Sequence, residues 1–339
     1  MTDARPLLTI EDMRIHYDSV RGAYKVVDGV DVEVHRNEIF GLAGESGCGK
    51  STLVEGILRL IEPPGHIHSG TALFRPFPED PERSLDLVQL DYHEMREIRW
   101  KHLSYIPQGS MNSLNPVMRI RDQMTDVVMH HEPGGQNEIN RNIAAALEMV
   151  GLPESLGALY PHELSGGMKQ RVCIAMSMLL QPALVVADEP TTALDVNVQR
   201  AVLETIAHLR DQMGAAVIFV SHDLAVHAEL VDRMAIMYAG VVMELGTVYE
   251  IFDNPQHPYT KRLIHSIPAL GGPRERLESI PGMAPSPLAW PEGCRFHPRC
   301  PDAVPACSSA TPRTIELDTG RKVTCHLFDP DIDLEQGSA

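Results

Sequence analysis

The stretch GESGCGKST, from Gly44 to Thr52, decides the fold of this chain. It follows the apolar run IFGLA at residues 39–43 and fits the phosphate-binding P-loop pattern G-x-x-x-x-G-K-S. Glycines let backbone N–H groups turn toward phosphate oxygens, and the helix that follows offers the positive end of its dipole. We expect Lys50 to reach the β- and γ-phosphates and Ser51 to hold Mg²⁺. The residues expected to bind the nucleotide here are Gly44, Glu45, Ser46, Gly47, Cys48, Gly49, Lys50, Ser51 and Thr52.

A second apolar run, LVVADE at residues 184–189, ends in two acids. A strand of this kind would deliver Asp188 to the metal, and Glu189 would polarise the water that attacks the γ-phosphate. Acids at a strand end are a weak signal alone, because such carboxylates are often only solvated. Together with the P-loop they predict hydrolysis of a nucleoside triphosphate.

The segment LSGGMKQR at residues 164–171 offers a second set of backbone N–H groups at a helix start. Because the P-loop already serves one nucleotide, this segment would serve another. Here the sequence resembles the signature of ATP-binding-cassette (ABC) ATPases, in which two cassettes meet head to tail over ATP. The resemblance implies that the partner's ATP is contacted by Ser165, Gly166, Gly167 and Gln170.

The resemblance extends to single residues elsewhere in the chain. Gln108 in YIPQ is similar to the Q-loop glutamine, Asp195 in TTALD to the D-loop aspartate, and His222 in VSHD to the switch histidine. Tyr17 resembles the aromatic residue that stacks on adenine, with Tyr24 as the alternative. The resemblance implies Glu189, His222 and Lys50 as catalytic residues, and Ser51, Gln108 and Asp188 as contacts to Mg²⁺.

Two further segments, GSMNSLNPVMRI at 109–120 and NPQHPYTKRL at 254–263, are similar to ATPases of oligopeptide and dipeptide importers. The resemblance covers residues 6–328. It implies an α/β P-loop fold of the ABC type with a mixed sheet at 1–267, a helical subdomain at about 109–180, and a small Cys-rich C-terminal domain at 268–339. Pro107 and Gly109 flank Gln108 where many relatives carry Phe and an acid, so oligosaccharide or nickel stays an alternative solute to peptide.

Four of the six cysteines gather near the end of the chain. Four thiolates suit an iron–sulfur cluster or zinc, and the absence of tight Cys-x₂₋₄-Cys pairs favours iron–sulfur. His297 and His326 keep zinc as an alternative. The resemblance implies a [4Fe–4S] cluster in some relatives, and a metal would supply folding energy to a tail with few apolar residues. The expected ligands are Cys294, Cys300, Cys307 and Cys325.

The net charge of −17 argues against a nucleic-acid partner, which requires clustered Lys and Arg. No signal peptide opens the chain, and no apolar stretch reaches the roughly 20 residues of a membrane-spanning helix. The resemblance implies a peripheral protein on the cytoplasmic face of the inner membrane. Its expected partners are two transmembrane permease subunits, a second and non-identical ATPase subunit, and an extracytoplasmic solute-binding protein.

These patterns are compatible with three classes of function. The first is an ATPase that powers solute import, and the second is an ABC-type ATPase acting on nucleic acid or the ribosome. The acidic balance, the single cassette and the lack of a long coiled coil argue against the second. The third is a redox protein, and the absence of flavin or nicotinamide fingerprints argues against it. The sequence favours the importer, and it leaves open the solute and whether the two ATPases are identical.

Overall fold

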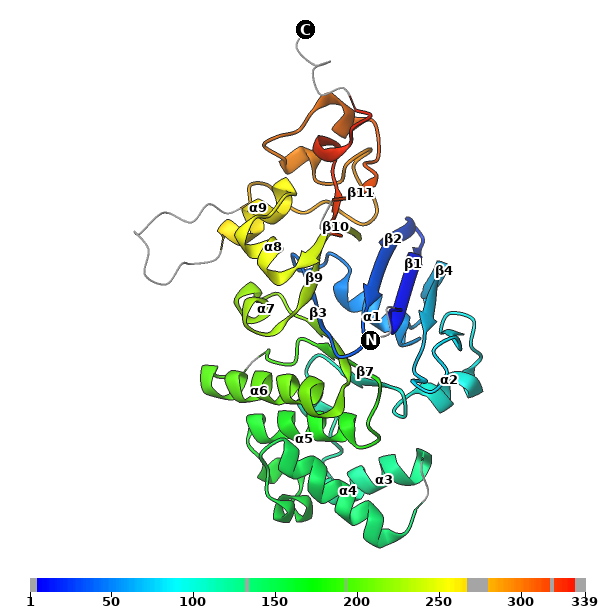
Figure 1. Ribbon diagram of the computed structural model, residues 1–339, viewed down its shortest axis with the longest axis vertical. Helices are drawn as coiled ribbons and strands as arrows, with labels where there is room; N and C mark the ends of the chain where they lie inside the picture. Colours follow the sequence, from blue (N-terminus) through cyan, green and yellow to red (C-terminus); the bar gives the residue numbers. More distant parts are fainter. Residues whose placement is uncertain (1–4, 132–133, 193, 267–279, 318–319, 333–339) are drawn as a thin grey trace. The chain divides into compact units, whose positions relative to one another are not determined.

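The computed structural model describes residues 5–131, 134–192, 194–266, 280–317 and 320–332. The chain forms two compact units that interleave in sequence. The first contains residues 1–8, 34–39 and 73–220, and the second contains 9–33, 40–72 and 221–339. Figure 1 labels most of their helices and strands. The expected domain boundary at residue 268 lies outside the described residues.

Three parallel strands form the sheet of the first unit, in the order β8 (Ala216–Val220), β7 (Leu184–Asp188), β6 (Leu103–Ile106). Every residue of β7 and β8 is buried. Continuous apolar runs of this length are typical of parallel strands covered on both faces. The short strand β5 (Leu85–Asp86) pairs with residues 73–74, and α2 (Tyr92–Ile98) begins in a capping box made by Asp91 and Glu94.

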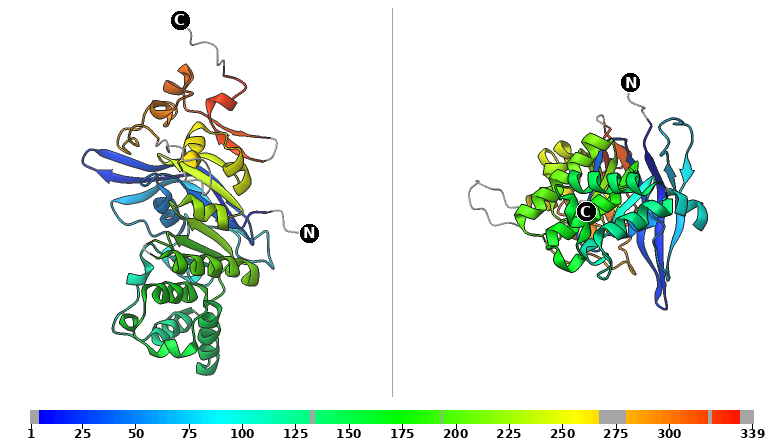
Figure 2. Two further views of the ribbon diagram at one scale, coloured as in Figure 1. Left: turned by 90° about the vertical axis from the view of Figure 1, so that its left-hand side faces the viewer. Right: turned by 90° about the horizontal axis from the view of Figure 1, so that it is seen from below.

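The helical part of this unit lies between β6 and β8 in sequence and contains α3 (Ile120–His131), α4 (Gln136–Met149), α5 (Gly166–Met178) and α6 (Val196–Met213). Three 3₁₀ turns connect them: η1 (Ser110–Asn112), η2 (Glu154–Ala158) and η3 (Pro161–Glu163). Helix α4 buries Ile139, Ile143 and Leu147, spaced by one helical turn. This spacing places the three side chains on one face of α4. Helices α3, α4 and α5 contact one another (Figures 1 and 2).

The second unit has a mixed sheet in the order β11 (Thr314–Glu316), β12 (Lys322–Thr324), β10 (Val241–Thr247), β9 (Arg233–Tyr238), β3 (Ile39–Ala43). Strand β3 runs parallel to β9, and the other neighbours are antiparallel. The tight hairpin between β9 and β10 turns at Ala239 and Gly240, both with positive φ. The predicted mixed α/β fold is confirmed. The helices of this unit are α1 (Lys50–Ile57), α7 (Leu224–Leu230), α8 (Val248–Asp253) and α9 (Pro258–His265).

A further sheet places β1 (Leu8–Ser19) between β2 (Gly22–Val34) and β4 (Gly65–Phe74). Strands β1 and β2 form the long dark-blue hairpin of Figure 2. Strand β2 alternates buried and more exposed residues from Val30 to Val34, whereas β1 buries consecutive residues at 8–10 and at 15–16.

The C-terminal segment belongs to the same compact unit as the P-loop. It has short 3₁₀ turns, η4 (His297–Arg299), η5 (Pro305–Ser308) and η6 (His326–Phe328), and its strands β11 and β12 extend the mixed sheet at β10. Phe296 is fully buried against Tyr238 and Tyr259, with ring centroids 5.3 Å from each. This aromatic packing joins the segment to the core.

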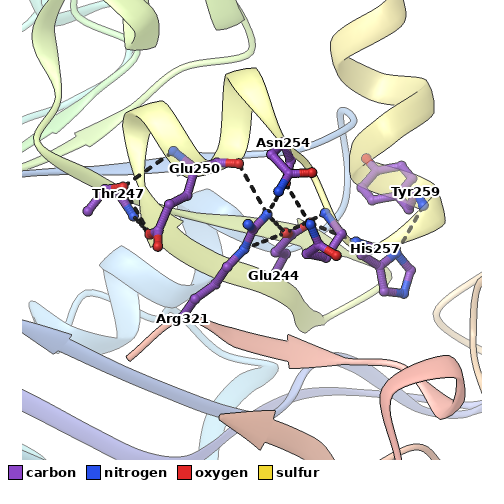
Figure 3. A network of polar contacts seen from close by, with 8 residues as sticks. Glu244, Thr247, Glu250, Asn254, His257, Tyr259 and Arg321 are labelled. Atoms are coloured by element: carbon purple, nitrogen blue, oxygen red, sulfur yellow. Dashed lines mark hydrogen bonds and ion pairs between the residues drawn. The ribbon is translucent and has the colours of Figure 1, made fainter. Parts of the chain in front are cut away.

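A buried ion pair also holds β12 in place (Figure 3). Glu244 on β10 is fully buried, and it accepts hydrogen bonds from Arg321 and from the backbone N–H groups of Gln256 and His257. Arg321 donates to the backbone oxygen of Asn254 at 2.7 Å as well. A buried pair of charges is tolerated only with such additional hydrogen bonds. Every carboxylate oxygen of Glu244 has a partner here.

Candidate nucleotide-binding and catalytic site

The P-loop connects the buried strand β3 to helix α1, as the sequence predicts. Gly44 has φ of 146°, and a Cβ there would stand 2.1 Å from the backbone oxygen of Met237. At Gly49, φ is 105° and a Cβ would stand 2.6 Å from the oxygen of Val26. Both the backbone angles and the available space therefore require glycine.

Lys50 is buried at the start of α1, and its ammonium donates to the backbone oxygens of Gly44 at 2.8 Å and Glu45 at 3.2 Å. The positive charge is thus held inside the loop that precedes it. Ser51 and Thr52 occupy the first turn of the same helix. The loop therefore presents a lysine, a hydroxyl and a helix N-terminus together, which is the donor set that phosphate and Mg²⁺ need.

Glu45 connects the P-loop to the C-terminal segment through contacts that sequence reasoning missed. Both terminal nitrogens of Arg299 donate to the two carboxylate oxygens of Glu45, at 2.8 and 3.0 Å. The backbone N–H of Glu45 donates to the hydroxyl of Tyr259 at 3.0 Å. Arg299 also donates to Tyr238 and to the backbone oxygens of residues 280 and 281. A bidentate arginine fixes the carboxylate in one orientation.

Tyr17 lies beside the P-loop helix, where its phenol hydrogen-bonds to Thr52. Burial, the main cause, raises the pKa of Tyr17. A Cβ at Gly65 would meet the Tyr17 ring at 2.6 Å, so the ring is packed against that glycine. Tyr24, the alternative, is half-buried on β2. Which of the two tyrosines stacks on adenine stays a prediction.

The two candidate residues for activating water, Glu189 and Gln108, lie together. Asp188 ends the buried strand β7, and Glu189 follows it with φ of 47°, a left-handed conformation that is rare for glutamate. The Glu189 carboxylate accepts from Gln108 Nε2 at 3.0 Å and from the Thr192 hydroxyl at 2.9 Å. Such strained residues gather at functional sites.

The signature segment forms the start of α5. Ser165 is the N-cap, and its hydroxyl accepts from the backbone N–H of Met168 at 3.3 Å. Gly166 and Gly167 form the first turn of the helix. Gly167 lies so close to α6 that a Cβ would be 2.5 Å from Val198. Glycine at this position is thus required by packing as well as by the proposed contact to a nucleotide.

Gln170, expected to contact the partner's ATP, is buried within the first unit. Its side-chain oxygen accepts from the Ser110 hydroxyl at 2.8 Å, and the Cys173 thiol donates to the Ser110 backbone oxygen at 3.2 Å. Burial raises the pKa of Cys173 to about 11. These bonds tie the signature helix to the turn that follows Gln108. The nucleotide contact of Gln170 stays a prediction.

Two remaining motif residues lie at helix starts. Asp195 caps α6, where it accepts from the backbone N–H of Val198 at 3.0 Å. His222 is exposed in the loop after β8, and the next residue, Asp223, caps α7. An exposed loop position leaves the imidazole accessible to a ligand. The roles of both residues stay predictions.

The four C-terminal cysteines are buried, except for the half-buried Cys300. Burial is the largest cause that raises the pKa of Cys294, of Cys300 to about 11, and of Cys325 to about 12, and neighbouring thiols raise each further. The backbone N–H of Cys294 donates to the Cys307 oxygen at 2.8 Å, and the N–H of His297 donates to the Cys294 oxygen at 3.0 Å. His297 and His326, the spare ligands, each have a ring nitrogen at a backbone oxygen.

Comparison with known proteins agrees with this geometry. The family described as "ABC transporter" matches residues 27–192, and "Oligopeptide/dipeptide transporter, C-terminal region" matches residues 243–307. The dipeptide transport ATP-binding protein DppD of Caldanaerobacter subterraneus is 39% identical, over 95% of this chain and 97% of that protein. The oligopeptide transport ATP-binding protein OppD of Escherichia coli is 38% identical, over 95% and 93%.

Solved structures show the same fold. The ABC transporter cassette MJ0796, solved as a dimer, aligns with a TM-score of 0.62 at 23% identity, over 71% of this chain and 98% of that chain. The transporter component CbiO1 of Clostridium perfringens aligns with a TM-score of 0.60 at 23% identity, over 74% and 92%. Across the described residues, no helix combines the length and the apolar character needed to cross a membrane.

These matches define the class of protein as a P-loop ATPase of the ABC type. The chain belongs to the family of ATP-binding subunits of oligopeptide and dipeptide ABC transporters, and it is therefore an ATP-hydrolysing transporter subunit.

Proposed function

We propose that this subunit powers the import of oligopeptides or dipeptides. The observation that carries the proposal is the oligopeptide/dipeptide-type C-terminal region that follows the cassette in one chain. A relative named for dipeptide transport is 39% identical to this chain, and one named for oligopeptide transport is 38% identical. Each alignment covers 95% of this chain. The subunit would act at the cytoplasmic face of the inner membrane, held by two permease subunits. An extracytoplasmic solute-binding protein would deliver the peptide.

The ATPase works as a head-to-tail pair in this proposal, with a second and non-identical ATPase subunit. This chain carries both a P-loop and a signature helix, so it can contribute one half to each of two nucleotide sites. The amides of Gly166 and Gly167 and the Ser165 hydroxyl are at the exposed start of α5, where a partner's phosphates would meet a helix N-terminus. The dimeric form of the cassette MJ0796 is consistent with this pairing.

Hydrolysis in this proposal depends on charge and position. Glu189, held by Gln108 and Thr192, accepts a proton from the attacking water, while Lys50 and His222 stabilise charge on the transferred phosphoryl group. Ser51 and Asp188, together with Gln108, would hold Mg²⁺, which neutralises phosphate charge when bound. Binding of two nucleotides would close the pair, and hydrolysis would release it.

A growth experiment tests the solute. Cells that lack this chain are supplied with an essential amino acid only as a dipeptide or an oligopeptide, and are complemented with the wild type or with Lys50→Ala. We expect growth with the wild type alone, and matched growth of all strains on the free amino acid. If the deletion instead abolishes uptake of nickel or of an oligosaccharide while peptide uptake continues, peptide is the wrong solute.

We also propose that Cys294, Cys300, Cys307 and Cys325 hold a [4Fe–4S] cluster. Four thiol side chains are the donor set of such a cluster, and two of these residues lie together, because the backbone N–H of Cys294 donates to the Cys307 oxygen at 2.8 Å. In the described residues, no three of the sulfurs lie within 4.8 Å of one another. Four thiolates on one zinc ion would stand about 3.8 Å apart, given the Zn–S distance. A cluster does not require that spacing, because its thiolates bind different irons.

The Cys300→Ser variant tests the cluster. We expect the anaerobically purified wild type to contain about four irons per chain and to absorb near 400 nm, and the variant to lose both, because one of four ligands is removed. The buried Cys173→Ser variant, which lies outside the group, serves as a control and should keep its iron. Equal iron and equal visible absorption in the wild type and Cys300→Ser would refute the assignment.

A further inference from the structure

Three histidines from two neighbouring strands meet in the second unit, and one of them, His16, directly precedes Tyr17 in sequence. His16 lies on β1, and His66 and His68 lie on β4. Residues two apart on a strand face the same side, so His66 and His68 both face one side of the sheet. One ring nitrogen from each of the three histidines lies within 4.8 Å of the others. Within the described part of the chain, this is the one group of three potential metal-ligand atoms that is so compact.

The packing of the rings is dense. The rings of His16 and His68 stack, with centroids 4.4 Å apart and planes at 18°. The ring of His66 stands edge-on to both, at 6.2 Å from each. This packing brings one nitrogen of each ring close to the others. Neutral imidazole is the form that binds metal ions.

His16 provides a second, independent observation. Its side chain is buried, with 7% of the residue exposed, and its Nε2 atom has no hydrogen-bond partner among the residues that the structure describes. An unsatisfied buried polar atom is costly, and such an atom calls for an explanation in a ligand or ion. His66 and His68 are exposed, so the group is open to solvent on one side. An ion can therefore reach the rings directly.

The surroundings favour a cation. Asp18 on β1 places a carboxylate oxygen 3.5 Å from His66 Nδ1, which is the outer-shell partner typical of a metal-binding histidine. The three ligand atoms are all imidazole nitrogens, a set that suits zinc, copper or nickel rather than magnesium or calcium.

We propose that His16, His66 and His68 form a binding site for one divalent transition-metal ion, with Zn²⁺ as the ion that fits best. Three protein nitrogens and a fourth, solvent-filled position make the coordination that zinc accepts in open sites. The site lies on β1 directly before Tyr17, whose phenol bonds to Thr52 of the P-loop helix. It is separate in sequence from the C-terminal cysteines.

The experiment uses the untagged full chain at pH 7.5, labelled with ¹⁵N in its histidine rings and titrated with ZnCl₂. We expect one set of imidazole resonances to shift with the first equivalent of ion, and His68→Ala and His66→Ala to weaken that binding at least about tenfold. Both positions are exposed, so these variants should fold normally, which circular dichroism checks. His93→Ala, an exposed histidine on α2, is the matched control and should bind like the wild type.

Zinc bound by the histidines must be distinguished from zinc bound by the C-terminal cysteines. The resonances of the histidine nitrogens report on the first site only, and the titration is repeated on Cys300→Ser. Unchanged histidine binding in that variant supports the proposal. If His66→Ala, His68→Ala and His93→Ala all bind Zn²⁺ like the wild type, or if no imidazole resonance shifts before several equivalents are added, the site is refuted.

Discussion

At the residue scale, Glu189 combines an unusual backbone with a catalytic candidate. Its left-handed conformation costs about 1–3 kcal/mol, which the fold must supply. The backbone N–H of Glu189 donates to the Val220 oxygen at 2.9 Å, and two side chains hold its carboxylate. The structure therefore keeps this carboxylate in one orientation at the end of β7.

Glu189→Gln should lower ATP hydrolysis by at least about 100-fold, because the amide cannot accept the proton of the attacking water. ATP binding and ATP-dependent association with the partner ATPase should persist, since the shape of the side chain is kept. Phosphate release and light scattering measure the two properties. The exposed Glu204→Gln is the control, and wild-type turnover in Glu189→Gln would contradict the assignment.

His257 gives a prediction about pH. It is fully buried, which lowers its pKa to about 3, and its Nδ1 accepts from the backbone N–H of Tyr259 at 2.9 Å. Between pH 6.5 and about 3, the unfolded chain binds a proton at this ring that the folded chain excludes. Stability contributed by neutral His257 is therefore present above pH 6.5 and is lost as pH falls.

His257→Asn should retain the helix cap, because asparagine offers an acceptor at the start of α9. Its free energy of unfolding should fall less steeply than that of the wild type between pH 6.5 and 4.5, by up to about 1.4 kcal/mol per pH unit. Urea unfolding at several pH values gives the slopes. His162→Asn, at an exposed histidine, should leave the slope unchanged, and equal slopes for wild type and His257→Asn would exclude this role.

At the element scale, the first turn of α5 packs against α6. Gly167→Ala would place a methyl group 2.5 Å from Val198, so the helices must separate or Val198 must move. We expect a loss of about 1–3 kcal/mol in the free energy of unfolding from this overpacking.

The neighbouring Gly166→Ala is a matched control, since its Cβ would stand 3.4 Å from the Met111 sulfur. It should change stability by much less, because alanine also favours the helix. Adding Val198→Ala to Gly167→Ala should restore most of the loss. Denaturant unfolding measures the free energy of unfolding of the wild type, the two single glycine variants and the double variant. A Gly167→Ala variant as stable as Gly166→Ala would count against close packing between α5 and α6.

At the scale of the whole molecule, the C-terminal segment reaches back to the P-loop. Arg299 and Glu45 are 254 positions apart in the chain and form a bidentate pair, with the arginine side chain 7% exposed. In a double-mutant cycle of Glu45→Gln and Arg299→Gln, we expect a coupling of about 0.5–3 kcal/mol in the free energy of unfolding.

The exposed pair Arg200 and Glu204, joined at 3.3 Å on α6, offers a control cycle. Its coupling should not exceed about 0.5 kcal/mol, because solvent screens both charges. If the two cycles give the same coupling, Arg299 does not hold the P-loop. If Glu45→Gln and Arg299→Gln keep the stability of the wild type but lose ATP binding, the Glu45–Arg299 pair acts on the nucleotide site alone.

The local motifs and their elements were predictable from sequence. Glycine spacing and apolar runs identified the P-loop between β3 and α1, the strand that ends at Asp188 and the hairpin at Gly240, because short-range sterics and periodicity dictate them. The contact between Gln108 and Glu189 follows from placing two motif residues at the ends of adjacent parallel strands.

Long-range pairs were decided by tertiary structure. The chain alone does not reveal that Arg299 holds Glu45, that Arg321 neutralises buried Glu244, or that His16 meets His66 and His68. Each of these contacts joins residues far apart in sequence, and their side chains meet only because strand order and register bring them together. Residue type and spacing determined the chemistry of the P-loop, and the fold determined which distant side chains surround it.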